Sequence, residues 1–171
     1  MNFVLPIFMR IKKITMQNKL NKCFLLLFVS TVITGSAASA QNAEDSIKTV
    51  INTMFTGMKN SDTALVKSCF TETAFMQTFG KDKEGKTIIT TETPSDFAKI
   101  IATIPAGAAD EQIVFKDLKI DGPMAAVWTP FKLYFNGKFY SCGVNSFQLV
   151  RLNNIWKIQY ILDTRRKTNC E

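Results

Sequence analysis

Two stretches of the chain alternate apolar and polar residues with the period of an α-helix. In residues 43–62 successive apolar residues lie alternately three positions and one position apart in the sequence, which places them on a single face. Residues 93–105 carry a second such face, and Thr93 followed by Pro94 is a typical helix start. A short helix is also expected over residues 63–70. The apolar face of the stretch 43–62 consists of Ile47, Val50, Ile51, Met54, Phe55 and Met58.

The rest of the chain has the pattern of β-strands. Two strands joined by a charged turn are followed by a long series of alternating segments, of which Asn136-Gly137 separates two and suits a type I′ turn. Helices followed by an antiparallel meander predict an α+β fold, and no linker divides residues 41–171, so we expect one domain. The expected strands cover residues 73–80, 87–92, 111–121, 123–135, 138–152 and 155–165, with a bulge near Lys116-Asp117.

The two predicted turns fix which strand residues share a face. If Asn136-Gly137 and Asn153-Asn154 are both two-residue turns, Asn145 lies opposite Trp128 on one neighbouring strand and opposite Leu162 on the other. Asn145 is then the polar residue on an otherwise apolar inner face that seats the helices. The other members of that face are Ala126, Trp128, Phe147, Leu149, Trp156, Ile158, Tyr160 and Leu162.

The same register predicts an apolar sector on the outer face of the sheet. A patch of this size favours burial against another surface. We expect a homodimer formed through this outer sheet face, and the alternative is that the chain ends cover it. The sector consists of Val127, Phe131, Leu133, Tyr140 and Val144.

Residues 1–40 have the composition of a secretory signal peptide. They contain five basic and no acidic residues, so the formal charge of +7 falls to +2 over residues 41–171 (16 basic minus 14 acidic). A basic stretch at 16–22, an apolar run at 23–33 and small residues ending at Ala40 predict cleavage near Ala40, with Met16 as the expected translation start. The apolar run is too short to span a membrane. We expect a periplasmic or secreted protein with no membrane span after signal removal.

Composition also excludes several kinds of site. The sequence has no histidine, so the usual base of a hydrolase triad and the usual nitrogen ligands of zinc are missing. The near-neutral mature chain argues against a nucleic-acid partner. No metal site and no cofactor are predicted. Cys69, Cys142 and Cys170 remain after the leader, and the sequence leaves their pairing open.

The order of elements resembles a known superfamily over residues 43–167. The segments that carry the resemblance are "INTMFTGMKNSDTALVKSCF", "DGPMAAVWTPFKLYFNGKFYSCGVNSF" and "WKIQYILDTRR". They are similar to nuclear transport factor two-like (SnoaL-like) proteins, and more closely to exported bacterial proteins that carry the family label lumazine-binding. The resemblance implies a cone-shaped α+β fold in which about three N-terminal helices pack on a strongly curved, mostly antiparallel sheet. It also implies a pocket, often in a dimer, and leaves the function open.

Three functions follow from these residues. A small-molecule binder would use Trp128 and Tyr160 as aromatic walls, with Asn145 and Gln77 as polar anchors; the alternative is that these residues belong to the core. An isomerase, cyclase or dehydratase would need a carboxylate in the pocket, and no acidic residue is predicted on the inner face. The nearest acidic residues are Asp117, Asp121 and Asp163, and all three are expected to be solvated. The third function is a structural or interaction module that uses the outer sheet face.

Overall fold

The structure is a computed structural model that describes residues 34–170, with side chains described from Gln41 onward. The predicted signal peptide therefore lies outside the residues whose side chains are described. The chain divides into two compact units, residues 1–43 and 44–171, and the second contains all the strands of the described residues. In the described part of the chain, no helix combines the length and the apolar character needed to cross a membrane.

The three described helices lie where the sequence predicts, except that the first begins at Thr34, nine residues before its predicted start at residue 43. Helix α2 (Thr34–Lys59) buries five of the six predicted apolar positions, and Val50 is partly buried. Helix α3 (Thr63–Ser68) starts where the Asp62 side chain accepts a hydrogen bond from the Leu65 amide. In helix α4 (Pro94–Ala102), Thr93 caps the Asp96 amide and Pro94 occupies the first turn, as predicted.

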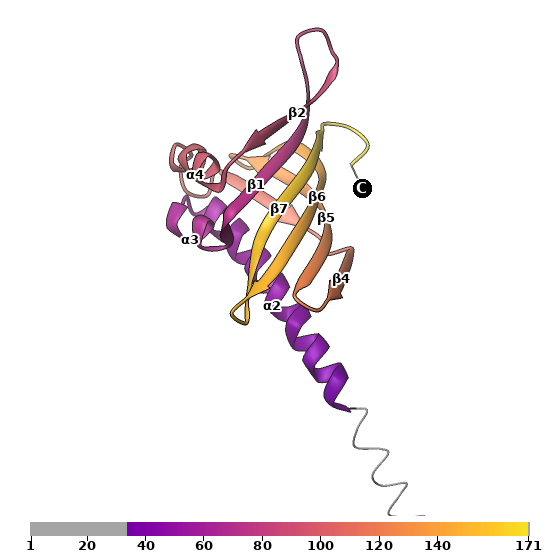
Figure 1. The fold of residues 1–171 in the computed structure, drawn as a ribbon. Helices are drawn as coiled ribbons and strands as arrows, with labels where there is room; N and C mark the ends of the chain where they lie inside the picture. Colours follow the sequence, from indigo (N-terminus) through magenta and orange to yellow (C-terminus); the bar gives the residue numbers. More distant parts are fainter. Residues whose placement is uncertain (1–33, 171) are drawn as a thin grey trace, which may run out of the picture. The chain divides into compact units, whose positions relative to one another are not determined.

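The strands form one mixed, mostly antiparallel sheet, which confirms the α+β class. Its order is β2-β1-β7-β6-β5-β3, with β4 paired to β5 beside β3 (Figure 1). Only β1 and β7 run parallel. The single strand expected over residues 111–121 is interrupted at residues 114–116, so it forms two strands. The strands are β1 (Phe70–Lys81), β2 (Thr87–Glu92), β3 (Ala109–Ile113), β4 (Asp117–Asp121), β5 (Met124–Phe135), β6 (Lys138–Leu152) and β7 (Ile155–Arg166).

Both predicted two-residue turns are present, but each hairpin also contains a bulge. Phe135 pairs with Lys138 and Leu152 pairs with Ile155, and the asparagines and the glycine of the two turns have positive φ. The β5–β6 pairing then shifts by one residue beyond Tyr134, and the β6–β7 pairing shifts beyond Leu149. A shift of one residue exchanges the two faces of a strand. The predicted faces are therefore correct for β6 from Cys142 onward, and wrong for β5 and for the second half of β7.

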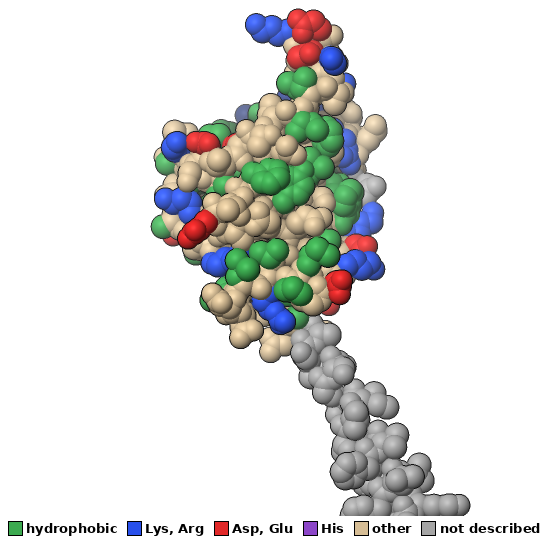
Figure 2. All heavy atoms as spheres, viewed as in Figure 1, with side chains coloured by type: hydrophobic (Ala, Val, Ile, Leu, Met, Phe, Trp, Pro, Cys, Tyr) green, Lys and Arg blue, Asp and Glu red, His purple; other side chains and the backbone are tan. Residues whose placement is uncertain are grey.

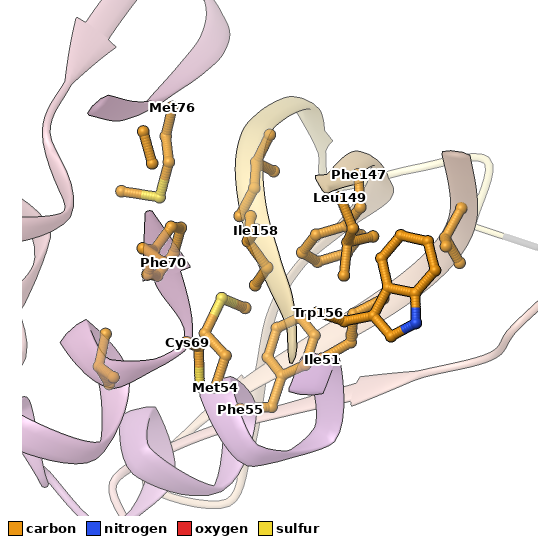
Figure 3. Packing of buried hydrophobic residues seen from close by; sticks show 14 of the residues in the cluster. Ile51, Met54, Phe55, Cys69, Phe70, Met76, Phe147, Leu149, Trp156 and Ile158 are labelled. Atoms are coloured by element: carbon orange, nitrogen blue, oxygen red, sulfur yellow. The ribbon is translucent and has the colours of Figure 1, made fainter. Parts of the chain in front are cut away.

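The hydrophobic core lies between α2 and the inner face of the sheet. Figure 3 shows Ile51, Met54 and Phe55 of α2 near Phe147 and Leu149 of β6. The Phe55 and Phe147 rings meet edge to face, with 6.2 Å between centroids. Trp156 and Ile158, at the correctly predicted end of β7, complete this part of the core.

The segment "CGVNSFQL" (142–149) of β6 is linked to the C-terminal end of the chain by a disulfide. Cys142 is paired with Cys170, with 5.8 Å between their Cα atoms, whereas Cys69 is buried and free. Gly143 pairs in register with Phe131, and a Cβ on this residue would come within 1.7 Å of the Thr164 carbonyl oxygen and 2.8 Å of Phe131 Cε1. The glycine therefore allows β5, β6 and β7 to pack closely at this level.

Candidate functional site

A cavity of about 460 Å³ opens between the helices and the inner face of the sheet. This volume is in the range of small-molecule sites. Its walls are mostly apolar, and its polar side chains come from the strands. The lining residues are Met54, Phe55, Met58, Met76, Glu92, Phe97, Ile100, Ile101, Ile104, Ala109, Glu111, Phe131, Leu133, Phe135, Tyr140, Asn145, Phe147, Ile161, Asp163 and Arg165.

Glu111 and Asn145 form a hydrogen-bonded pair in the cavity wall. The Asn145 Nδ2 group donates to Glu111 Oε1 at 2.9 Å. Asn145 is buried on β6, and Glu111 is half-buried on β3, on the far side of β5. The two residues thus meet across an intervening strand.

Burial raises the pKa of the Glu111 carboxyl to about 7. The hydrogen bond from Asn145 and the charge of Arg165 oppose this shift, while the charge of Asp163 adds to it. Removal of a carboxylate from water disfavours its charged form more than these two partners favour it. Glu111 therefore exchanges its proton near neutral pH.

An ion pair forms a second polar group in the cavity. Arg165 donates from Nε to Asp163 Oδ1 at 3.0 Å and from Nη2 to Asp163 Oδ2 at 3.1 Å. The Thr78 hydroxyl donates to Asp163 Oδ2 at 2.9 Å. Asp163 is buried, whereas about half of the Arg165 side chain is exposed. The charge of the buried carboxylate is therefore matched by a bidentate guanidinium.

Glu92 is the third carboxylate of the cavity wall. It ends β2 and pairs in register with Met76 of β1. Burial raises the pKa of its carboxyl, and Asp163 and Asp96 contribute to the rise, while Arg165 opposes it. Among the described residues, Glu92 has no hydrogen-bond or ion-pair partner.

Only one of the four residues predicted to contact a ligand lines this cavity. Asn145 lies in its wall, opposite Thr129 on β5 and Asp163 on β7. Trp128 points to the outer face and is 48% exposed. The Tyr160 hydroxyl donates to Gln77 Oε1 at 2.8 Å, and neither residue lines the cavity. A ligand-binding role for Asn145 stays a prediction.

The residues that the sequence reasoning missed are the charged ones. Asp163 was expected to be solvated on the outer face, but the extra residue in β7 turns it inward and buries it. The expectation of no inward-facing acid is therefore wrong. Asp117 and Asp121 are exposed, as expected. Glu111 follows the loop 103–108, and no sequence signal we recognise marks it as a cavity residue.

The outer sheet face also differs from its predicted composition. Of the residues predicted on this face, Val127 and Phe131 are buried on the inner face of β5. Leu133 and Tyr140 line the cavity. Figure 2 shows hydrophobic side chains gathered on the sheet face that is turned to the viewer. The exposed aromatic residues of this face include Trp128 and Phe75, with Phe75 stacked on Tyr160 at 4.7 Å between ring centroids. Dimerisation through this face stays a prediction. The exposed aromatic residues available for such a contact are Trp128 and Phe75, since Val127 and Phe131 are buried.

Helices that cover one face of a mostly antiparallel sheet, with a cavity between the layers, define an α+β class. Within it, the chain has the NTF2-like fold, which is also described as cystatin-like. One similar solved structure is an NTF2-like protein of unknown function from Shewanella baltica, at a TM-score of 0.60 and 16% identity, over 74% of this chain and 96% of that one. Another is an NTF2-like protein of unknown function from Silicibacter pomeroyi, at a TM-score of 0.61 and 12% identity, over 74% of this chain and 98% of that one.

A third similar structure is a domain of unknown function with a cystatin-like fold from Nostoc punctiforme, at a TM-score of 0.57 and 15% identity, over 74% of this chain and 78% of that one. No family model and no curated protein sequence matches the chain significantly. At these identities the similarity establishes the fold, and function has to be argued from the cavity.

Proposed function

We propose that the protein binds a small, largely apolar molecule in the cavity between the helices and the sheet. The observation that carries this proposal is the Glu111–Asn145 pair, a hydrogen-bonded carboxylate and amide set into apolar walls. A cavity with few polar groups holds a ligand by burying its apolar surface and orients it through those groups. The aromatic walls are Phe55, Phe97, Phe131 and Phe147 rather than the predicted Trp128 and Tyr160.

Native mass spectrometry of protein purified from its own host tests this proposal directly. We expect an added mass that is retained under gentle conditions and lost on denaturation. Ala109→Phe places a ring where a small side chain lines the cavity, so it should abolish retention and also weaken uptake of the neutral dye Nile red. Ala126→Phe, on the opposite face of the sheet, is the matched control and should change neither. Equal retention by both variants would contradict binding in this cavity.

The raised pKa of Glu111 favours a second candidate function, acid–base catalysis. A carboxyl that gains and loses its proton near pH 7 suits a general base, and a low-polarity pocket is where such groups are found. In this function Glu111 would take a proton from a carbon of the bound molecule and return it at another position. Asn145 would hold the carboxylate in place. Return of the proton to another carbon gives an isomerisation, and its transfer to a departing hydroxyl group gives a dehydration with release of water; the sequence left both reactions open.

Deuterium exchange distinguishes catalysis from simple binding. The retained molecule is incubated with the protein in D₂O and its mass is then measured. Proton abstraction by Glu111 should introduce deuterium at carbon in the wild type and not in Glu111→Gln. A ligand that binds but keeps all its C–H hydrogens would contradict catalysis and leave the binding proposal intact.

Export is the remaining part of the proposed function. The basic, apolar and small-residue segments of 1–40 support it, as does the Cys142–Cys170 disulfide, because disulfides persist in oxidising compartments. Sequencing the N-terminus of protein from the host should give a start near Gln41. A mature protein that retains residues 16–40 would contradict cleavage.

A further inference from the structure

The unused polar atoms of the cavity are mostly oxygens, apart from the second N–H of the Asn145 amide, the remaining N–H groups of Arg165 and the Tyr140 hydroxyl. Glu111 uses Oε1 to accept from Asn145, so its Oε2 has no partner, and Asn145 uses Nδ2 to donate, so its Oδ1 has none. Among the described residues, the one buried side-chain atom that is sealed from solvent without a partner is Ser141 Oγ. The free oxygens of Glu111 and Asn145 are therefore open to the cavity that these residues line.

The charges that line the cavity do not balance. Glu92, Glu111 and Asp163 are three carboxylates, and Arg165 is the only lysine or arginine among the lining residues. Arg165 is already committed, because both its Nε and its Nη2 donate to Asp163. Glu92 and the outer oxygen of Glu111 are thus left without a cation within bonding distance.

Lys59 and Lys99, which adjoin lining residues in sequence, are paired with aspartates, whereas Lys167 Nζ lies 5.8 Å from the ring centroid of Tyr140. Lys59, at the end of α2, pairs with Asp110 at 2.9 Å, and Lys99 of α4 pairs with Asp96 at 2.9 Å. Tyr140 is the remaining titratable group of the lining, and its side chain is exposed at the edge. A bound molecule would therefore supply the missing positive charge itself.

We propose that the cavity selects a molecule with an apolar body and a cationic, donor-bearing head, such as a protonated amine, which binds at the Glu111–Asn145 pair. An ammonium group has three donors and no acceptor, which complements a set of free acceptor oxygens. In a low-polarity cavity an unpaired carboxylate is costly, and a matching cation removes that cost. A carboxylate head would meet acceptors and like charges instead. This inference rests on the proposed binding function and names its ligand class.

Three naphthalene compounds of the same shape test the inference. They carry an aminomethyl, a hydroxymethyl or a carboxylate group at the same ring position, so only the head differs. Their dissociation constants are measured by calorimetry at pH 8.5 and 5.5. At pH 8.5 we expect the ammonium compound to bind at least ~10-fold more tightly than the alcohol, a change that corresponds to one charged hydrogen bond. The carboxylate should bind most weakly.

Variants assign the preference to a particular carboxylate. Glu111→Gln should reduce the preference for ammonium over alcohol, whereas Glu84→Gln, in the exposed β1–β2 turn, should leave it unchanged. Protonation of Glu111 at pH 5.5 should reduce the preference in the wild type and have less effect in Glu111→Gln. Binding of the alcohol in each variant shows that the cavity is still formed.

The outcomes separate this inference from the function on which it rests. If the alcohol binds and the ammonium compound binds no better, the charge preference is wrong and the binding cavity stands. The same holds if the carboxylate binds best, which would mean that Arg165 receives the ligand. If none of the three compounds and no Nile red bind, both proposals fail.

Discussion

Asn145 and Glu111 lie on strands that are not neighbours in the sheet, yet the Asn145 side chain donates to the Glu111 carboxylate at 2.9 Å. The hydrogen bond crosses above β5 on the side that faces the cavity. It joins the central strand β6 to the edge strand β3, which is otherwise paired only with β5. The pair is thus both a structural link and the polar part of the cavity.

Glu111→Gln should stabilise the protein at alkaline pH. The pKa of the carboxyl is about 7 in the folded protein against 4.5 for an ordinary glutamate, so the unfolded chain releases the proton first. Between these two values the folded state holds more protons, and its stability falls as the pH rises, by up to about 3 kcal/mol. Glutamine avoids this loss and keeps an acceptor for Asn145. Urea denaturation at pH 4 should give nearly equal stabilities, and at pH 8.5 the variant should be more stable.

Glu84→Gln is the matched control for this measurement, since Glu84 is exposed in a turn. It should leave the pH dependence as in the wild type. A Glu111→Gln variant with the same pH dependence as the wild type would mean that Glu111 is well solvated.

Asn145→Leu should destabilise the protein in a way that depends on the charge of Glu111. When the carboxylate is ionised, loss of its donor costs about 1.5–3 kcal/mol, as for other hydrogen bonds to charged groups. At pH 4 the carboxyl is protonated and the cost should be smaller. Combination with Glu111→Gln, measured by the same urea titration, should remove most of the difference between the two pH values. An equal loss at both pH values would assign the effect to packing instead.

Gly143→Ala should be among the most damaging single substitutions in the sheet. The new methyl would overlap the Thr164 carbonyl oxygen of the neighbouring strand, so β6 and β7 would have to separate. We expect a loss of about 3 kcal/mol or more in the free energy of unfolding, together with displacement of Phe131 from the cavity wall. Gly80→Ala is the control: it is also a strand glycine, but the nearest atom to its Cβ is 3.8 Å away. Similar losses for both would contradict the close approach at Gly143.

Cys170→Ser should destabilise the oxidised protein by about 3 kcal/mol, because the disulfide to Cys142 closes a loop with a sequence separation of 28 residues. Thermal denaturation with and without a reducing agent checks this. The reducing agent should lower the melting temperature of the wild type toward that of the variant and leave the variant unchanged. Equal melting temperatures under oxidising conditions would show that the disulfide adds no stability.

The sequence was sufficient for the elements that depend on local patterns. The apolar face of α2, the Thr93 cap and both asparagine turns follow from residue spacing and turn chemistry, and all are present. The β6 faces follow as well, because that strand is bounded by the two turns. The β-bulges could not be placed, since each depends on how one extra residue, in β6 near Tyr140 and in β7 near Gln159, is accommodated between neighbouring strands.

These two extra residues explain the errors in the candidate site. One moves Trp128 to the outer face and brings Thr129 opposite Asn145; the other moves Tyr160 outward and Asp163 inward. In "CGVNSFQL", the prediction that Asn145 is the inward polar residue is correct, but Thr129 takes the place of its expected neighbour Trp128, and Asp163 takes the place of Leu162. The position of Glu111 in the cavity could not be predicted, because its contact with Asn145 crosses the intervening strand β5 and no local sequence pattern encodes such a contact.

Trp128→Lys should weaken self-association of the protein if two copies meet through the outer face of the sheet. Trp128 is 48% exposed and lies in register with Ser146 of β6, which in turn pairs with Leu162 of β7. An exposed tryptophan over a sheet surface is typical of the centre of an interface, and a lysine there would have to be desolvated next to its symmetry mate. Sedimentation velocity should show a dimer for the wild type and at least ~10-fold weaker association for Trp128→Lys, a change of about 1.4 kcal/mol. Ile155→Lys, at a residue that is 57% exposed but lies at the turn between β6 and β7, should leave the dimer unchanged. A monomeric wild type, or equal weakening by both variants, would rule out an interface centred on Trp128.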